Sequence, residues 1–404
     1  MKKVFEIALG IVTSIGGFLE AGSVATSAQA GAGFRFQLLW SVALGTLALV
    51  FLVEMAGRLS AVSGTTLAGA MRARLGFPLF VLPLVTVSLV AWLVLATELG
   101  GVSVALELAS GVSHRVWAIP VVVVGWLLLW RGTFGVIEKG VSLLGLVTVA
   151  FVVAAVRLHP AWGAVAHGFV PTRPTTNGAH YWYLAVNILG ATIAPYLLYF
   201  YSAGAVEDGW DEGHLGVNRA VAAIGMCFGG ALSCAVMIAA GVALSPRGGR
   251  VDSYAQIVPT LTSVFGHWGL VLFVLSLGIA CLGAALEVAL SLAYLMAQGF
   301  GWNWSENAKP RDASRFALVY TVAMLLAVIP VVAGVDVLKL TNLSMAFTAL
   351  SLPFAIGPML ILMNDDDYVG AHRNGVVSNT VVMLTIAAAF VLAAVSIPLV
   401  IVGG

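Results

Sequence analysis

Charged residues are scarce in this chain of 404 residues: only 9% are Asp, Glu, Lys or Arg, whereas 60% are hydrophobic. The net charge is +1, and no basic stretch interleaved with aromatic residues could follow a phosphate backbone, which excludes nucleic acid as a partner. The apolar residues form repeated runs near or above the roughly 20 residues that cross a bilayer. The composition therefore predicts a polytopic membrane protein without a large soluble domain.

The chain also lacks the residue clusters of a membrane enzyme. Its three cysteines, Cys227, Cys234 and Cys281, have neither disulfide nor zinc spacing and fall in apolar runs. Its seven histidines lie in loops or at the ends of apolar runs, with no H-E-x-x-H arrangement. Phosphate-binding glycine loops and nucleophile elbows are missing as well. We therefore expect neither an enzyme nor a resident cofactor.

We predict an all-α integral membrane protein, because backbone groups in lipid must be satisfied within each segment. Eleven transmembrane helices are expected, at residues 7–30, 38–57, 79–105, 116–131, 135–157, 181–203, 217–244, 266–298, 313–333, 340–363 and 376–402. A cytoplasmic N-terminus places twelve of the 19 Lys and Arg residues on the cytoplasmic side, in agreement with the positive-inside rule. The bilayer is therefore an expected partner, and the sequence does not indicate an oligomeric state.

Two of these spans contain helix breakers at corresponding places, about half the chain apart. One break lies at residues 16–23 and the other at residues 190–195. Paired interrupted helices are typical of inverted-repeat transporters, whose binding site lies between the breaks at the bilayer midplane. The whole chain is then one membrane domain, with repeats at about 5–160 and 178–365 and an extra helix at about 374–403.

Glu20 is the only full charge at the first break. A carboxylate at membrane depth costs several kcal/mol or more unless a partner or a ligand compensates it. Ser23 lies three residues further on and can point its hydroxyl to the same side, while Gly22 weakens the helix between them. These residues predict one half of a cation site, although a structural ion pair between Glu20 and a distant Lys or Arg is the alternative.

Pro195 marks the second break. It removes one amide donor and frees a carbonyl upstream, so that the backbone oxygens from Ala191 to Ala194 can face the site. A plain kink without a binding role is the alternative for Pro195. If these oxygens do face the site, the second break supplies the other half of the predicted cation site.

Two further acids lie within apolar spans. Glu98 is on the third span, and Glu287 is near the centre of the eighth. Membrane carboxylates of this kind form proton relays or bind cations. Each could instead be hydrogen-bonded to a neighbouring helix for structural reasons. We assign both to a transport pathway as a hypothesis.

The two breaks and their flanks resemble those of the NRAMP family of divalent metal transporters, which has Asp-Pro-Gly-Asn in its first helix and Met-Pro-His in its sixth. Residues 20–40 and 58–68 resemble the family's first helix and the linker between its second and third helices. Residues 298–300 and 351–358 resemble the ends of its eighth and tenth helices. The resemblance covers nearly the whole chain. It implies a LeuT-type fold of five-plus-five inverted repeats, with helices 1 and 6 interrupted and an eleventh helix, in a bacterial plasma membrane.

The site departs from the family's pattern in a consistent direction. Glu20 replaces Asp, Ser23 replaces Asn, and Ala194 stands where the family has a Met ligand. Tyr196 replaces a His, and Asn342 stands where the tenth helix of the family has Gln. Loss of the thioether leaves oxygen donors, which suit a hard and partly hydrated ion such as Mg²⁺. In this respect the chain resembles the magnesium-transporting branch of the family.

The same comparison predicts weak or no proton coupling. The family's two sixth-helix histidines correspond to Tyr196 and Tyr201, and its third-helix acid pair is reduced to Glu98, with Gly101 at the second place. Tyrosine titrates near pH 10 and cannot carry protons at neutral pH as histidine does. Uncoupled transport is therefore expected.

The leading hypothesis is a secondary transporter of divalent cations, Mg²⁺ or Mn²⁺, that works by alternating access with the metal ion as its substrate. A second hypothesis keeps the fold and makes the substrate a small organic or monovalent cation, held by a cation–π contact with Tyr196. A third is a non-transporting membrane sensor that signals through the acidic loop at residues 207–212.

Overall fold

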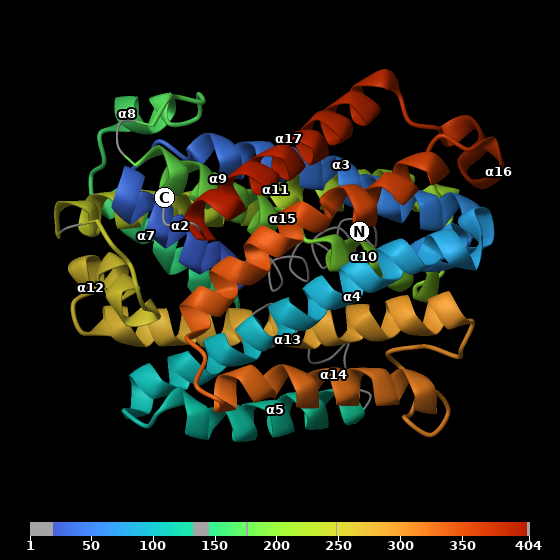
Figure 1. The fold of residues 1–404 in the computed structure, drawn as a ribbon, viewed down its shortest axis with the longest axis horizontal. Helices are drawn as coiled ribbons and strands as arrows, with labels where there is room; N and C mark the ends of the chain where they lie inside the picture. The colour runs from blue at the N-terminus through green and yellow to red at the C-terminus, as the bar shows by residue number, and fades with distance from the viewer. Residues whose placement is uncertain (1–18, 132–144, 175–176, 248, 402–404) are drawn as a thin grey trace.

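The computed structural model describes residues 19–131, 145–174, 177–247 and 249–401, which form helices and loops without any strand. Eight helical segments of this part of the chain are long and apolar enough to cross a membrane. They are α3 (Leu39–Ser63), α4 (Leu67–Ser110), α9 with α10 (Gly178–Thr192 and Pro195–Glu207), α11 (Leu215–Ala243), α13 (Trp268–Phe300), α14 (Ser314–Val332), α15 (Val337–Leu362) and α17 (Val376–Ile401). Figure 1 shows that these long helices run side by side, and the predicted all-α membrane fold is confirmed.

Shorter helices complete the bundle. Apolar α5 (His114–Trp130) corresponds to the predicted fourth span, and α7 (Ala150–Arg157), which continues η1 (Leu146–Val149), falls within the predicted fifth. Residues 7–18 of the first predicted span and 135–144 of the fifth lie outside the described residues, and α2 (Ala21–Phe34) is the described part of the first. The remaining short helices are α8 (Trp162–His167), α12 (Pro259–Phe265), α16 (Asp366–Val369), η2 (Glu212–His214), η3 (Ser245–Arg247), η4 (Tyr254–Ile257) and η5 (Gly370–His372).

The interruption predicted in the sixth span is present. Helix α9 ends at Thr192, and α10 begins at Pro195, whose missing amide and fixed φ suit the first position of a helix. Ile193 and Ala194 between them have non-helical backbone angles. The third span differs from its predicted bounds, because α4 starts twelve residues before residue 79, at Leu67, and Gly76 breaks its path with a φ of 71°.

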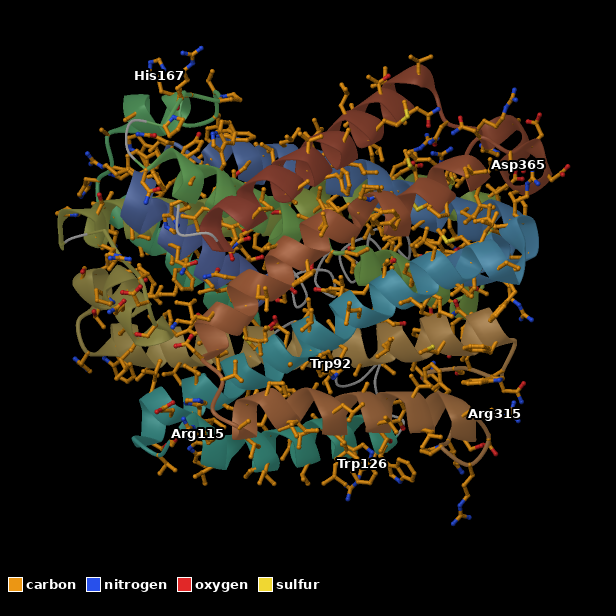
Figure 2. All side chains as sticks on the ribbon, in the orientation of Figure 1. Trp92, Arg115, Trp126, His167, Arg315 and Asp365 are labelled. Atoms are coloured by element: carbon orange, nitrogen blue, oxygen red, sulfur yellow. The ribbon has the colours of Figure 1, made fainter. Side chains whose placement is uncertain are left out.

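Polar side chains gather at the two ends of the bundle, as a membrane-spanning protein requires. Figure 2 shows His167 and Arg115 at one end of the long axis, and Asp365 and Arg315 at the other. Large apolar side chains between the ends are exposed on the outer surface, for example Leu79 on α4, at 64%. These surfaces are the ones that lipid covers in a bilayer.

Two glycine contacts fix the helices that carry the breaks. A Cβ on Gly31 of α2 would lie 2.2 Å from the carbonyl oxygen of Met237 on α11. A Cβ on Gly190 of α9 would lie 2.0 Å from the carbonyl oxygen of Met345 on α15. Each pair of backbones is therefore closer than any side chain would allow, which holds α2 against α11 and α9 against α15.

Candidate functional site

The first half of the site is built at the start of α2. Glu20 has an extended backbone, with φ −92° and ψ 173°, and its carbonyl oxygen accepts the N–H of Val24 at 3.1 Å. Its carboxylate does not cap the helix, because no side-chain hydrogen bond to the first turn is formed. Glu20 is only 4% exposed, so its side chain points into the protein.

The second half is built where α9 gives way to α10. Tyr196, the second residue of α10, donates its hydroxyl hydrogen to Oε2 of Glu20 at 2.6 Å. This hydrogen bond joins residues 176 positions apart. The start of α2 therefore meets the break between α9 and α10 in space, as expected for the midplane site of a transporter with discontinuous helices.

A small cavity of about 20 Å³ lies at this meeting point. It is close to the size of one water molecule. Its walls come from α2, α3, α9, α10, α11 and α13, and they are Glu20, Ser23, Thr46, Leu49, Ala191, Thr192, Ala194, Tyr196, Leu197, Met226, Gly229, Gly230, Ser233 and Glu287. The structure thus brings together Glu20, Ser23, Ala191, Ala194, Tyr196 and Glu287 from the predicted set, with Gly22 and Pro195 at the breaks.

The cavity is rich in oxygen atoms that could hold a cation. Oε1 of Glu20 and Oγ1 of Thr46 are buried and have no hydrogen-bond partner. Ala191 belongs to the last turn of α9, whose carbonyls have no amide partner within the helix and which forms the negative end of the helix dipole. Among the described residues, no three His, Cys, Asp or Glu side chains are placed to share a metal ion. A cation here would therefore meet at most two carboxylates, those of Glu20 and Glu287, together with neutral oxygen donors.

Three predicted residues lie elsewhere. Glu98 does not line the cavity, and its Oε2 accepts the N–H of Ala21 at 3.1 Å, at the first residue of α2. Tyr201 donates to Oδ1 of Asn218 at 3.0 Å and is likewise absent from the cavity walls. Asn342 on α15 is half-buried, and its Oδ1 has no hydrogen-bond partner, but it does not line the cavity either.

Two methionines change the expected oxygen-only donor set. Met226 of α11 lines the cavity, and Met345 of α15 places its thioether against Gly22 of α2. Sulfur-containing side chains therefore lie near Glu20, although Ala194 stands where the family has its Met ligand. No sequence signal indicated these residues, because a methionine in an apolar helix is most simply read as packing.

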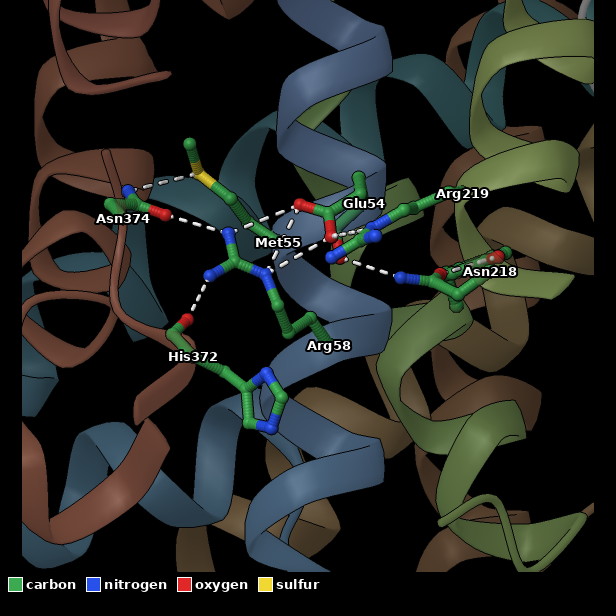
Figure 3. A network of polar contacts seen from close by, with 8 residues as sticks. Glu54, Met55, Arg58, Asn218, Arg219, His372 and Asn374 are labelled. Atoms are coloured by element: carbon green, nitrogen blue, oxygen red, sulfur yellow. Dashed lines mark hydrogen bonds and ion pairs between the residues drawn. The ribbon is translucent and has the colours of Figure 1, made fainter. Parts of the chain in front are cut away.

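A second polar cluster, the Arg58 network, lies near one end of α3. Figure 3 shows Arg58 in bidentate contact with Glu54, with nitrogen–oxygen distances of 3.0 to 3.2 Å. The same guanidinium donates to the carbonyl oxygen of His372 and to Oδ1 of Asn374, the latter at 2.7 Å. The amide of Asn218 donates to the carbonyl oxygen of Glu54 at 2.8 Å. This network joins α3 to α11 and to the segment that precedes α17.

An interrupted helix that meets the start of α2 around a buried carboxylate is typical of a membrane transporter with discontinuous helices. The family model described as natural resistance-associated macrophage protein-like (Nramp) matches residues 10–399. The chain belongs to the Nramp family.

Relatives and solved structures agree with this assignment. A protein of Aeromonas hydrophila named divalent metal cation transporter MntH is 28% identical over 382 residues, which is 92% of this chain and 90% of that protein. A protein of the same name from Klebsiella pneumoniae strain 342 is 27% identical over 365 residues, 88% of this chain and 84% of its own. Both relatives are named as transporters and not as enzymes.

The fold is shared with solved transporters. The manganese transporter of Eremococcus coleocola, in complex with an aromatic bis-isothiourea compound, superimposes with a TM-score of 0.81 at 22% identity, over 97% of this chain and 86% of that one. MhsT in complex with L-phenylalanine gives a TM-score of 0.57 at 15% identity, over 96% and 97% of the two chains. The predicted LeuT-type fold is thereby confirmed.

Proposed function

We propose that this protein is a secondary transporter of divalent metal cations that works by alternating access, with Glu20 as the charge-compensating ligand. One observation carries the proposal: Glu20, which has a buried carboxylate oxygen without a hydrogen-bond partner, lines a cavity between the start of α2 and the break before α10. An unpaired carboxylate in such a place costs free energy that a bound cation recovers. The names of the Aeromonas, Klebsiella and Eremococcus proteins support the substrate class.

Mn²⁺ and Mg²⁺ are the ions that we propose, hard or partly hydrated. The donors around the cavity are mostly oxygen atoms, which both ions accept. The cavity volume of about 20 Å³ favours a single ion over a small organic cation. The sensor hypothesis relied on the acidic loop at residues 207–212. The Glu207 carboxylate in this loop accepts hydrogen bonds from Tyr294, Ser305 and Asn307, which supports a structural role for it.

We further propose that transport is weakly coupled or uncoupled to protons. The tyrosine hydroxyls at positions 196 and 201 donate hydrogen bonds to Glu20 and Asn218, which is how neutral phenols behave. The space beside Gly101 is also occupied, since a Cβ there would lie 2.6 Å from Sγ of Cys281. We place the protein in a bacterial plasma membrane with its N-terminus in the cytoplasm.

Uptake into proteoliposomes tests the proposal. Wild-type protein should take up Mn²⁺ down its gradient, and Glu20→Gln should abolish this uptake. Glu107→Gln is the matched control, because Glu107 pairs with His114 at 2.5 Å, outside the cavity. Full activity of Glu20→Gln would overturn the role of Glu20, and no wild-type uptake of any divalent ion would overturn the function. A strong dependence of uptake on an imposed pH gradient would contradict the absence of coupling.

A further inference from the structure

We propose that a cavity beside the Arg58 network binds the phosphate group of an anionic membrane lipid. The cavity has a volume of about 500 Å³ and lies between α3, α11 and the segment that runs from η5 to the first turn of α17. None of its wall residues belongs to the cavity at Glu20. The lipid site is therefore separate from the proposed ion site.

Arginine residues from three segments line this cavity. Arg58 comes from α3, Arg219 from α11 and Arg373 from the turn after η5. Figure 3 shows Arg58 and Arg219 beside Glu54, the one carboxylate among the described wall residues. Because Arg58 already neutralises Glu54, at nitrogen–oxygen distances of 3.0 to 3.2 Å, the other two guanidinium groups leave an excess of positive charge. Guanidinium groups match the geometry of phosphate oxygens.

Acids at the edge of the cavity offset little of this charge. Asp366 contacts Arg373 at 3.0 Å, and Glu212 lies 3.8 Å from the wall residue His372. The side chains of both acids are largely exposed. Exposed ion pairs are weak because water screens them, so Arg373 can turn from Asp366 to a phosphate group.

The start of α17 adds backbone donors to the arginines. Gly375, directly before this helix, and Ser378 in its first turn both line the cavity. The first amides of a helix have no acceptor within the helix and form the positive end of its dipole. Phosphate oxygens accept hydrogen bonds from such N–H groups. The helix start and the arginines therefore favour the same ligand.

Apolar wall residues point to a lipid as the source of the phosphate. On α3, Phe51 lies about two turns before Arg58, and on α11, Ala223 lies one turn after Arg219. The arginines are near the end of α3 and near the start of α11, so both apolar residues lie toward the middle of the bundle. Ile224, next to Ala223, is 52% exposed on the surface that lipid covers. Basic pockets of this kind between transmembrane helices bind anionic headgroups, with the acyl chains beside the apolar walls.

Thermal unfolding of the purified full-length protein in detergent tests the site. Micelles that contain phosphatidylglycerol should raise the thermal midpoint, because a ligand that binds only the folded state stabilises it, and phosphatidylcholine should not. The double variant Arg219→Gln/Arg373→Gln should need about tenfold or more phosphatidylglycerol for the same shift. Arg311→Gln/Arg315→Gln is the matched control, since both arginines are exposed at the same end of the bundle and outside the cavity walls.

Three outcomes would overturn the proposal. They are equal shifts with the two lipids, equal sensitivity of the two double variants to phosphatidylglycerol, and a shift with glycerol 3-phosphate as large as that with phosphatidylglycerol. The last outcome would assign the cavity to a soluble phosphate compound.

Native mass spectrometry of the wild type gives a second measurement that needs no variant. The protein should retain phosphatidylglycerol in preference to phosphatidylcholine, and retention without preference would contradict an anionic site. The midpoints of both double variants in lipid-free detergent report whether these proteins are folded. None of these measurements involves transport, so a failure of the proposed transport function would leave the lipid site standing.

Discussion

Glu20 and Glu54 are both carboxylates on the inner faces of the bundle, and the protein surrounds them in opposite ways. Both oxygens of Glu54 are bound by the guanidinium of Arg58, and Arg219 approaches to 3.9 Å. Glu20 is more deeply buried, has one donor, the hydroxyl of Tyr196, and keeps one oxygen without a partner. The more expensive carboxylate is therefore the one that receives less compensation.

Under the proposed function, this difference separates an acid that holds helices together from an acid that is left open for a cation. A bidentate guanidinium is the strongest partner a carboxylate finds in a protein, and it blocks access by a metal ion. Leaving Oε1 of Glu20 without a donor costs stability, and the protein recovers that free energy only when a positive ion binds. The number of hydrogen-bond donors at each carboxylate is therefore the difference that separates the two proposed roles.

The largest expected effect tests this distinction directly. Glu20→Gln should reduce Mn²⁺ uptake about 100-fold or more. In the proposed site Glu20 and the bound ion form a buried charge pair, and removing one charge of such a pair costs roughly 3–5 kcal/mol. Glu54→Gln should keep uptake within about threefold of the wild type, a difference of less than about 1 kcal/mol, since Glu54 does not line the cavity. Equal losses of uptake in the two variants would break the comparison and place Glu54 on the transport path.

Removing the guanidinium of Arg58 should affect the stability of the protein more than its transport activity. Arg58→Gln should lower the free energy of unfolding by about 1–3 kcal/mol, because it leaves charged hydrogen bonds of Glu54 unmade. The thermal midpoint of the purified protein measures this loss. Arg219→Gln is the matched control, since its side chain is 66% exposed and 3.9 Å from Glu54, and its midpoint should change little. If Arg219→Gln lowered the thermal midpoint more than Arg58→Gln does, Arg219 and not Arg58 would be the main partner of Glu54.

Removing the single donor at Glu20 should sharpen the comparison further. Tyr196→Phe should raise the KM for Mn²⁺ about 5- to 30-fold, because the hydrogen bond to the carboxylate contributes about 1–2 kcal/mol to holding it in place. Tyr201→Phe removes a hydroxyl that is bound to Asn218 outside the cavity, and its KM should match the wild type. Identical KM values for Tyr196→Phe and the wild type would show that Glu20 needs no positioning.

A third carboxylate, at the surface, should give the smallest effect. The N–H of Asp367 and the guanidinium of Arg74 hold the pKa of Asp365 below its usual range. A folded-state pKa below the unfolded one stabilises the protein at neutral pH, and this contribution disappears as the pH falls through the folded-state pKa. Asp365→Asn should therefore lower the thermal midpoint slightly at pH 7, with the difference vanishing in strong acid. A midpoint difference that grows on acidification would contradict this sign.

The fold could be predicted from the sequence because the bilayer leaves few solutions. Apolar runs gave the helices, and the break at Pro195 was visible since proline removes an amide from the helix. The bounds of α4 were less accurate, because its start at Leu67 precedes the apolar run and only the structure shows the turn at Gly76. Hydropathy detects the part of a helix that lies in lipid and not its extension beyond it.

The site was predictable only in part. Glu20 was found because a lone acid in an apolar run is conspicuous, and its partner Tyr196 was placed by the resemblance at the second break. Met226 and Met345 carried no signal, since their position at the cavity or against Gly22 depends on how α11 and α15 pack. Contacts between distant helices are a property of the three-dimensional structure, which one sequence without periodic pattern at those positions does not specify.

The close contact at Gly22 has an evolutionary consequence. Any side chain at position 22 would overlap the end of Met345, whereas a shorter residue at 345 would leave room for one. A side chain at position 22 therefore requires the end of Met345 to turn away or position 345 to change. We expect larger residues at position 22 to occur together with smaller residues at position 345 among related sequences.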